Sequence, residues 1–176
     1  EGLWQRSQAL RPDDLARADY FGSHLCRHED ELFVGVPTDK SQSWQNGRVR
    51  CFTQNDGTWA DTSSIFPTRD IAGNRFGAAI ARVGDWLAVG ESGFGTGSRD
   101  TQRWGAVSLY QQNDLGEWRY QKRIENPIKG LGGFFGQELL AYQGSLIVLA
   151  TNQQEKKDDP RKCSVYRLDP NTEKLT

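Results

Sequence analysis

The segment FGSHLCRHEDELFVGVP (21–37) decides the fold, because the chain contains it in three altered copies. The other two copies are FGAAIARVGDWLAVGES (76–92) and FGQELLAYQGSLIVLAT (135–151). Each copy begins with Phe-Gly, and an apolar run begins eleven residues after the Phe. Self-similarity at a nearly constant period indicates a fold made from copies of one supersecondary unit.

A tryptophan opens each unit, and the three tryptophans lie 55 and 59 residues apart: Trp4, Trp59 and Trp118. These landmarks divide the chain into repeats of approximately 4–58, 59–117 and 118–176. The 176 residues are enough for one domain with a hydrophobic core. The sequence therefore predicts a single region, 1–176, that is built from three units.

Each unit is predicted to form four short β-strands. A further apolar run follows a long loop in every unit: GRVRCF (47–52), GAVSLY (105–110) and KCSVYR (162–167). The runs are rich in β-branched and aromatic residues, and turn residues such as Asn55-Asp56-Gly57 separate them. Four antiparallel strands in 55–59 residues match a propeller blade. The prediction is an all-β, β-propeller-type fold of three four-stranded antiparallel blades.

The strand pattern is predicted to be offset from the ends of the chain, which begins with a fourth strand and ends with a third. The segment 3–12 has the pattern of a fourth strand, whereas the third unit lacks one of its own, so we expect the N-terminal strand to close a blade. Three blades cannot form a ring, because propellers have about four to eight. Three completions stay open: a C2 homodimer of six blades, a larger propeller or assembly, and an open arc capped by partner subunits.

The unit resembles the FG-GAP repeat, the blade of the integrin α-chain propeller. The matching residues are Phe21-Gly22 with Gly35-Val36-Pro37, and Phe76-Gly77 with Gly90-Glu91-Ser92. The third unit keeps Phe135-Gly136 but departs at the second landmark, where it has Leu149-Ala150-Thr151. The resemblance implies a secreted repeat protein with a role in protein binding or cell adhesion, and a ligand face formed by long loops.

Integrin-type repeats can carry a calcium loop in the turn between the first two strands. Calcium needs six to eight oxygen ligands, but the turns at 28–31, 83–86 and 142–145 are short and lack the aspartate-rich pattern. The chain therefore resembles the calcium-free, short-turn type. We expect no metal and no cofactor.

Composition narrows the class of partner. The net charge is −1, the mean hydropathy is −0.72, and there is no methionine, even at position 1. We therefore expect no nucleic-acid partner and no membrane insertion, and we interpret the chain as a processed extracellular or cell-surface product. The three cysteines, Cys26, Cys51 and Cys163, are expected to be small buried hydrophobes, with one disulfide or an intermolecular bridge as the alternative.

No catalytic residues are predicted. The chain has two histidines, His24 and His28, and nothing in the sequence marks the nearby Ser23 as an activated nucleophile. The glycine-rich stretch 93–97 lacks the Lys-Ser/Thr ending of a phosphate-binding loop. The chain is therefore predicted not to be an enzyme.

Binding is predicted on the long loops at 38–46, 92–104 and 151–161, which we expect to emerge together on one face of the propeller. The candidate binding residues in these loops are Trp44, Phe94, Arg103 and Trp104. The alternative is that each tryptophan packs beneath its own loop. The resulting hypothesis is a non-catalytic module that recognises a protein or glycan and forms a homodimer or larger assembly. The alternative hypothesis is a structural scaffold subunit of a larger extracellular assembly.

Overall fold

The computed structural model describes residues 7–16, 18–40, 46–69, 71–95, 103–128, 133–153, 160 and 162–176. Within these residues the chain forms eleven strands and no helix. The strands are β1 (Leu25–His28), β2 (Glu31–Val36), β3 (Arg48–Asn55), β4 (Thr58–Ile65), β5 (Phe76–Val83), β6 (Trp86–Glu91), β7 (Ala106–Gln112), β8 (Trp118–Glu125), β9 (Glu138–Tyr142), β10 (Ser145–Gln153) and β11 (Lys162–Leu168).

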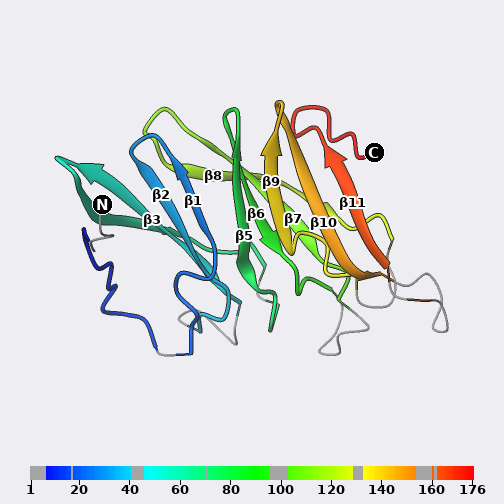
Figure 1. The fold of residues 1–176 in the computed structure, drawn as a ribbon, viewed down its shortest axis with the longest axis horizontal. Helices are drawn as coiled ribbons and strands as arrows, with labels where there is room; N and C mark the ends of the chain where they lie inside the picture. The colour runs from blue at the N-terminus through cyan, green and yellow to red at the C-terminus, as the bar shows by residue number, and fades with distance from the viewer. Residues whose placement is uncertain are drawn as a thin grey trace, which may run out of the picture.

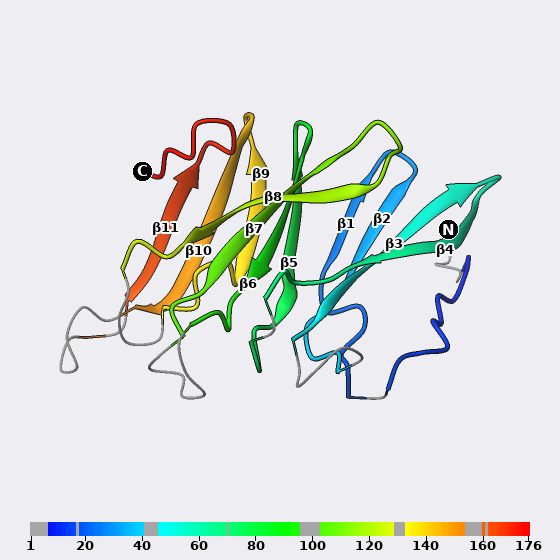
Figure 2. The ribbon, with the colours of Figure 1, turned by 180° about the vertical axis from the view of Figure 1, so that it is seen from behind.

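The strands form three antiparallel sheets that follow one another in chain order (Figure 1). The first blade is β1–β4, the second is β5–β8 and the third is β9–β11. The opening strands β1, β5 and β9 lie toward the viewer in Figure 1, and the fourth strands β4 and β8 lie toward the viewer in Figure 2. The predicted all-β, propeller-type fold is confirmed.

Local sequence explains the tight hairpins. Asp56-Gly57 and Gln143-Gly144 each place two successive residues at positive φ, with values of 48° and 78° and of 47° and 72°. Two positive φ angles give the type I′ geometry, whose twist matches that of paired strands. These short turns lie along the upper edge of the blades in Figure 1, and the described parts of the long connections lie along the lower edge.

The hydrophobic core consists of layers between successive blades. We call the side of each sheet that points toward the next blade in the chain its forward face. Phe33 and Val49 on the forward face of the first blade pack with Phe76 and Leu87 of the second. Val107 and other forward-face residues of the second blade pack in the same way against the third blade. Each interface therefore buries apolar surface from two sheets, which is how repeat units stabilise one another.

Glycines let the main chains of neighbouring blades touch. A Cβ at Gly35 would overlap the carbonyl oxygen of Gly77, and a Cβ at Gly90 would overlap that of Gly136. The second glycine of each pair belongs to the Phe-Gly that opens the following blade. In the third blade the residue equivalent to Gly35 and Gly90 is Leu149, which accepts the same hydrogen bond from a Phe-Gly glycine, Gly136, at 3.1 Å.

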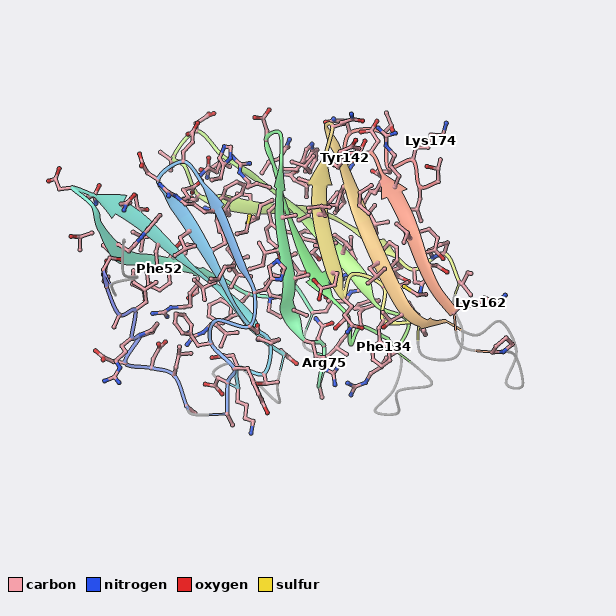
Figure 3. All side chains as sticks on the ribbon, viewed as in Figure 1. Phe52, Arg75, Phe134, Tyr142, Lys162 and Lys174 are labelled. Atoms are coloured by element: carbon pink, nitrogen blue, oxygen red, sulfur yellow. The ribbon has the colours of Figure 1, made fainter. Side chains whose placement is uncertain are left out.

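The residue before each Phe-Gly has a left-handed backbone although it is not glycine. The φ angles are 56° at Tyr20, 57° at Arg75 and 39° at Phe134. Arg75 and Phe134 lie close together at the lower edge of the blades (Figure 3), with the guanidinium carbon 5.8 Å from the ring centroid. Three non-glycine residues in this conformation at one repeat position show that the same strained entry into the opening strand is built into every blade.

The ends of the chain differ from the prediction. The predicted strand at 3–12 is described only from residue 7, and residues 7–12 form no strand. Instead, the side-chain amide of Gln8 bonds to the main chain of Trp59 in β4, in both directions, at 2.8 Å. The third blade has three strands, but Thr176 pairs with Arg167 of β11 through two main-chain hydrogen bonds of 2.8 and 2.9 Å.

Free thiols occur at all three cysteines, and each lies within a strand. Cys51 is buried, Cys26 is partly buried and Cys163 is exposed, so the expectation of burial is wrong for Cys163, which lies on the last strand with no following blade over it in the described chain. The part of the chain that the structure describes contains no helix of the length and hydrophobicity that a membrane crossing requires.

Candidate functional site

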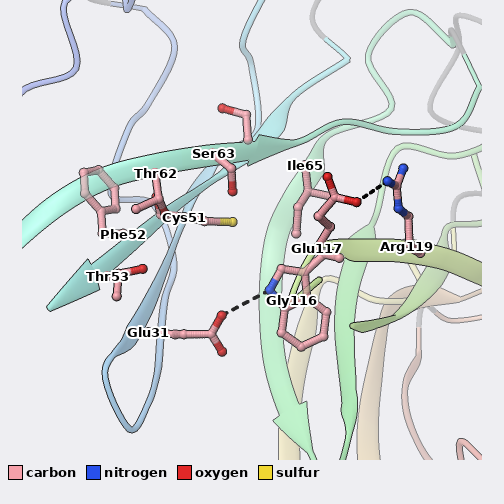
Figure 4. Close-up of a pocket in the computed structure, with 12 residues that line it drawn as sticks. Glu31, Cys51, Phe52, Thr53, Thr62, Ser63, Ile65, Gly116, Glu117 and Arg119 are labelled. Atoms are coloured by element: carbon pink, nitrogen blue, oxygen red, sulfur yellow. Dashed lines mark hydrogen bonds and ion pairs between the residues drawn. The ribbon is translucent and has the colours of Figure 1, made fainter. Parts of the chain in front are cut away.

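A polar groove of about 520 Å³ lies between the first blade and the β7–β8 hairpin of the second (Figure 4). The first blade contributes Glu31 from β2 and a series of hydroxyl groups from β3 and β4, and the second contributes residues 116–119. The hydroxyl-bearing residues are Thr53, Thr62, Ser63 and Ser64. The groove thus combines two carboxylates, several hydroxyls and one tryptophan from segments far apart in the sequence.

A β-bulge explains the concentration of hydroxyl groups on the first blade. The register between β3 and β4 shifts between Cys51 and Phe52, because Cys51 pairs with Ser63 and Phe52 with Asp61. Thr62 is the extra residue, and its hydroxyl donates to the carbonyl of Cys51 at 3.0 Å. A bulge re-aims side chains locally, and here it brings hydroxyls from consecutive residues of β4 to one groove.

Glu31 is fixed from the opposite wall. Its Oε1 accepts hydrogen bonds from Nε1 of Trp118 at 3.3 Å and from Nε2 of Gln112 at 3.1 Å. Trp118 is itself held by Phe33 and Arg82, with the Phe33 ring centroid at 5.6 Å and the Arg82 guanidinium carbon at 4.7 Å. The carboxylate is therefore oriented by donors from the second blade.

Glu117 is the second carboxylate of the groove, and its side chain is exposed. Asn113 donates a hydrogen bond to Glu117 at 2.9 Å, and Arg119 forms an ion pair with it. The hydrogen bond from Asn113 and the charge of Arg119 lower the pKa of this carboxyl. Glu117 is therefore ionised at neutral pH and acts as a hydrogen-bond acceptor.

Cys51 lines the groove but is not a nucleophile. Burial raises the pKa of its thiol to about 12. Burial also raises the pKa of Cys26, which lies on β1 on the same forward face, separated from Cys51 by Phe33 of β2. The thiolate is the reactive form of cysteine, and a raised pKa disfavours it. The groove therefore offers a ligand hydrogen bonding rather than a reactive thiol.

The next blade interface shows that the groove is not a general consequence of the fold. Trp86 stands four residues before Gly90, just as Glu31 stands four before Gly35. Lys122 has the register position of Ser63, and its Nζ lies 4.9 Å from the centroid of the Trp86 ring. The bulk of a tryptophan and a lysine thus occupies the place where the first interface has a carboxylate and a small hydroxyl.

The predicted binding residues that the structure describes lie elsewhere, on the loop side of the second blade. Trp44 lies outside the described residues. The rings of Phe94 and Trp104 are 6.4 Å apart, and Phe94 is buried beneath the guanidinium of Arg123, whose central carbon is 4.7 Å from the ring centroid. Arg103 donates to the carbonyl of Gly73 at 2.9 Å. The structure brings these three residues together as loop packing, and their role in binding stays a prediction.

Ser23 and His24 do not form a catalytic pair. The hydroxyl of Ser23 donates to the carbonyl of Gly35 at 3.3 Å, and Nε2 of His24 bonds to the carbonyl of Ile80 at 3.1 Å. Across the described ranges, no three His, Cys, Asp or Glu side chains are grouped so that they could hold a metal ion. The groove is therefore the best-defined candidate site, and it was not among the sites predicted from the sequence.

No family model matches the chain. Among solved structures, the chain is similar to a GH32 beta-fructofuranosidase of Bombyx mori, a mutant in complex with sucrose. The two are 18% identical with a TM-score of 0.46, and the match covers 92% of this chain and 37% of that enzyme. The chain thus spans little more than a third of the length of the enzyme it matches. At this level of similarity neither substrate nor reaction is transferred to the chain.

This comparison corrects the predicted function. The chain was expected to be a non-catalytic module, or alternatively a structural scaffold, and not to be an enzyme. The similar structure belongs to an enzyme, which contradicts these predictions. Function has to be argued from a site rather than from the fold, and the site that the structure offers is the groove between the first two blades.

Proposed function

We propose that the groove between the first and second blades binds a neutral, hydroxyl-rich ligand of the carbohydrate class. One observation carries the proposal: two fixed carboxylates and several hydroxyls line a single hollow of about 520 Å³, and the equivalent place at the next interface is filled by Trp86 and Lys122. Small-molecule sites usually have volumes of about 300–1,000 Å³, so the groove is large enough for a small saccharide.

The chemistry of the lining favours a polyol. The carboxylates of Glu31 and Glu117 supply hydrogen-bond acceptors, whereas serine and threonine hydroxyls both donate and accept. A sugar offers hydroxyls that do both, and hydrogen bonds to ionised groups are the stronger ones. Among the residues that line the groove the one cation, Arg119, is already paired with Glu117, so a phosphate or carboxylate ligand would meet like charge at Glu31.

We also propose that the blades are of the FG-GAP type. The contacts of Gly35 with Gly77 and of Gly90 with Gly136 support this, because they give both glycine landmarks of the unit one physical role. This kinship identifies no ligand, since one blade type serves many functions.

The proposal is tested by titrating the chain with a panel of mono- and disaccharides in calorimetry. The decisive variant is Glu31→Trp, which gives the first interface the residue of the second. We expect it to abolish saccharide binding, and Glu31→Gln to weaken binding about tenfold, because it replaces a carboxylate acceptor with an amide. Asp114→Asn, on the same hairpin but outside the groove, is the matched control and should bind like the parent.

Three outcomes count against the proposal: no saccharide in the panel binds, Glu31→Trp binds like the parent while retaining its circular dichroism spectrum, or a sugar phosphate binds more tightly than the neutral sugar. The same mixtures are analysed by chromatography for released monosaccharide. Release by the parent that is lost in Glu31→Trp would assign turnover to the groove.

A further inference from the structure

The forward face of the third blade is an apolar surface. The strand register pairs Leu140 with Ile147 and Leu149 with Val165, so these four side chains lie on one side of the sheet. Leu140 and Val165 are 62% and 63% exposed, and Tyr142, on the same side, is 55% exposed. The third blade forms one end of the row (Figure 1), and large apolar side chains gathered on an exposed face mark an interaction surface.

The equivalent faces of the other two blades are buried within the chain. Phe33 and Val49 of the first blade and Ala88 and Val107 of the second are 0% exposed, because the next blade covers each face. The fold therefore uses this side of every sheet for packing. On the third blade the residues are larger than on the second, with Ile147 in the position of Ala88.

A further blade of the same type cannot dock on the third blade in the same way. Gly35 and Gly90 carry no side chain at the point where the Phe-Gly carbonyl of the next blade approaches. Leu149 stands at this point in the third blade. Its side chain would collide with an approaching Phe-Gly, including the Phe21-Gly22 that opens the first blade of a second copy.

Head-to-tail association would need the face of the first blade opposite its forward face, and the N-terminal segment packs against this face. Asp14 forms ion pairs with Arg48 and Arg50 of β3, with N–O distances of 2.8 and 3.1 Å. The ring of Phe21 packs at 6.2 Å from that of Phe52, which is 3% exposed. The segment before β1 thus occupies part of the side of the first blade that a preceding blade would cover.

The charges on the forward face of the third blade are complementary to those on the same face of a second copy. Glu138 pairs with Leu149, and Arg167 pairs with Ile147, so one acid and one base flank the apolar residues on the same side of the sheet. A two-fold axis passing between Ile147 and Leu149 in the plane of the interface exchanges the two charged positions. Glu138 of one copy then faces Arg167 of the other, and the apolar side chains meet at the centre.

We infer that two copies of this chain pair face to face through the forward faces of their third blades. The contact is isologous, because the same surface is used by both copies and the assembly closes at two. It is a sheet-on-sheet packing of the kind found in β-sandwiches. This dimer is independent of the groove, which lies between the first and second blades.

Sedimentation equilibrium over a range of concentrations tests the inference. The parent chain is expected to approach twice its mass of 19.8 kDa and to stop there. Val165→Asp, at an exposed position, should give a monomer with an unchanged circular dichroism spectrum. Leu25→Asp is the matched control: Leu25 is 61% exposed on the first blade, and this variant should still dimerise, whereas head-to-tail association would be lost.

A charge-reversal cycle adds a second readout. Glu138→Arg and Arg167→Glu should each weaken the dimer about tenfold, and the double variant should recover it. A parent chain that remains monomeric, oligomers that grow beyond two, a dimer that is lost in Leu25→Asp, or one that survives Val165→Asp would each overturn the inference.

Discussion

Nε of Arg123 in β8 lies 3.1 Å from Oε1 of Glu91 in β6, and both side chains are buried. The hydroxyl of Ser108 also donates to Glu91, and Asn74 donates to its other oxygen at 2.7 Å. The network joins three strands of the second blade to the segment before β5. The equivalent residue is Val36 in the first blade and Ala150 in the third, so this ionic centre is a feature of the second blade within the described chain.

Glu91→Ala is expected to destabilise the chain by about 3–5 kcal/mol, because it leaves the Arg123 charge buried without its partner. Urea unfolding followed by circular dichroism measures the change. Replacing both residues together, as Glu91→Val with Arg123→Met, should cost much less than the sum of the two single variants. Additive losses would mean that the pair is not coupled.

Gly90→Ala is expected to destabilise the second interface by about 2 kcal/mol or more, because the new Cβ overlaps the main chain at Gly136. The comparison is Leu149→Ala at the equivalent position of the third blade, where no following blade of the described chain approaches, measured in the Val165→Asp background so that the proposed dimer does not contribute. This variant should change stability by less than about 1 kcal/mol. Equal losses in the two variants would refute the close contact.

Acid is expected to weaken the attachment of the N-terminal segment. The hydrogen bond from Arg48 lowers the pKa of Asp14 below its ordinary value of 3.8. A carboxyl with a lowered folded-state pKa stabilises the fold above the unfolded-state pKa, and this contribution is lost as the pH falls through the lower folded-state value. Melting temperatures measured between pH 6 and 2 should therefore depend less on pH in Asp14→Asn. Asp13→Asn serves as the control and should follow the parent curve.

Thiol labelling is expected to distinguish the exposed Cys163 from the buried Cys51 by their reactivity. Cys163 is exposed, whereas burial raises the pKa of Cys51 to about 12 from 9.0. A rise of this size reduces the thiolate fraction at neutral pH by roughly a thousandfold. Iodoacetamide followed by peptide mass mapping should modify Cys163 in the native chain and Cys51 only after unfolding. Rapid native labelling of Cys51 would contradict its burial.

The repeated blades could be predicted from the sequence because the landmarks recur. Phe76 and Phe135 are fully buried, and Phe-Gly, the apolar runs and the turn residues together indicate where the hairpins lie. Of the strand predicted at 3–12, the described residues 7–12 form no strand, because apolar pattern alone does not determine the pairing partner. Residues 7–12 meet β4 through the side chain of Gln8 rather than through a ladder of main-chain hydrogen bonds.

The groove could not be predicted from local patterns, because its walls come from β2, β3, β4 and the β7–β8 hairpin. A signal was nevertheless present in the alignment of the repeats: Glu31 stands where the second unit has Trp86. For the described aromatic residues of the long loops, the sequence suggested exposure where the structure shows packing. Phe94 looked like a candidate for an exposed contact, but the guanidinium of Arg123 covers it, and a contact between residues 29 positions apart is not visible in a linear pattern.

The contacts of Gly35 with Gly77 and of Gly90 with Gly136 have a mechanical consequence. Because main chain meets main chain at these points, the step from one blade to the next is set by backbone atoms, which cannot change rotamer. The two walls of the groove belong to different blades, and the main-chain contact between Gly35 and Gly77 fixes the distance between these blades.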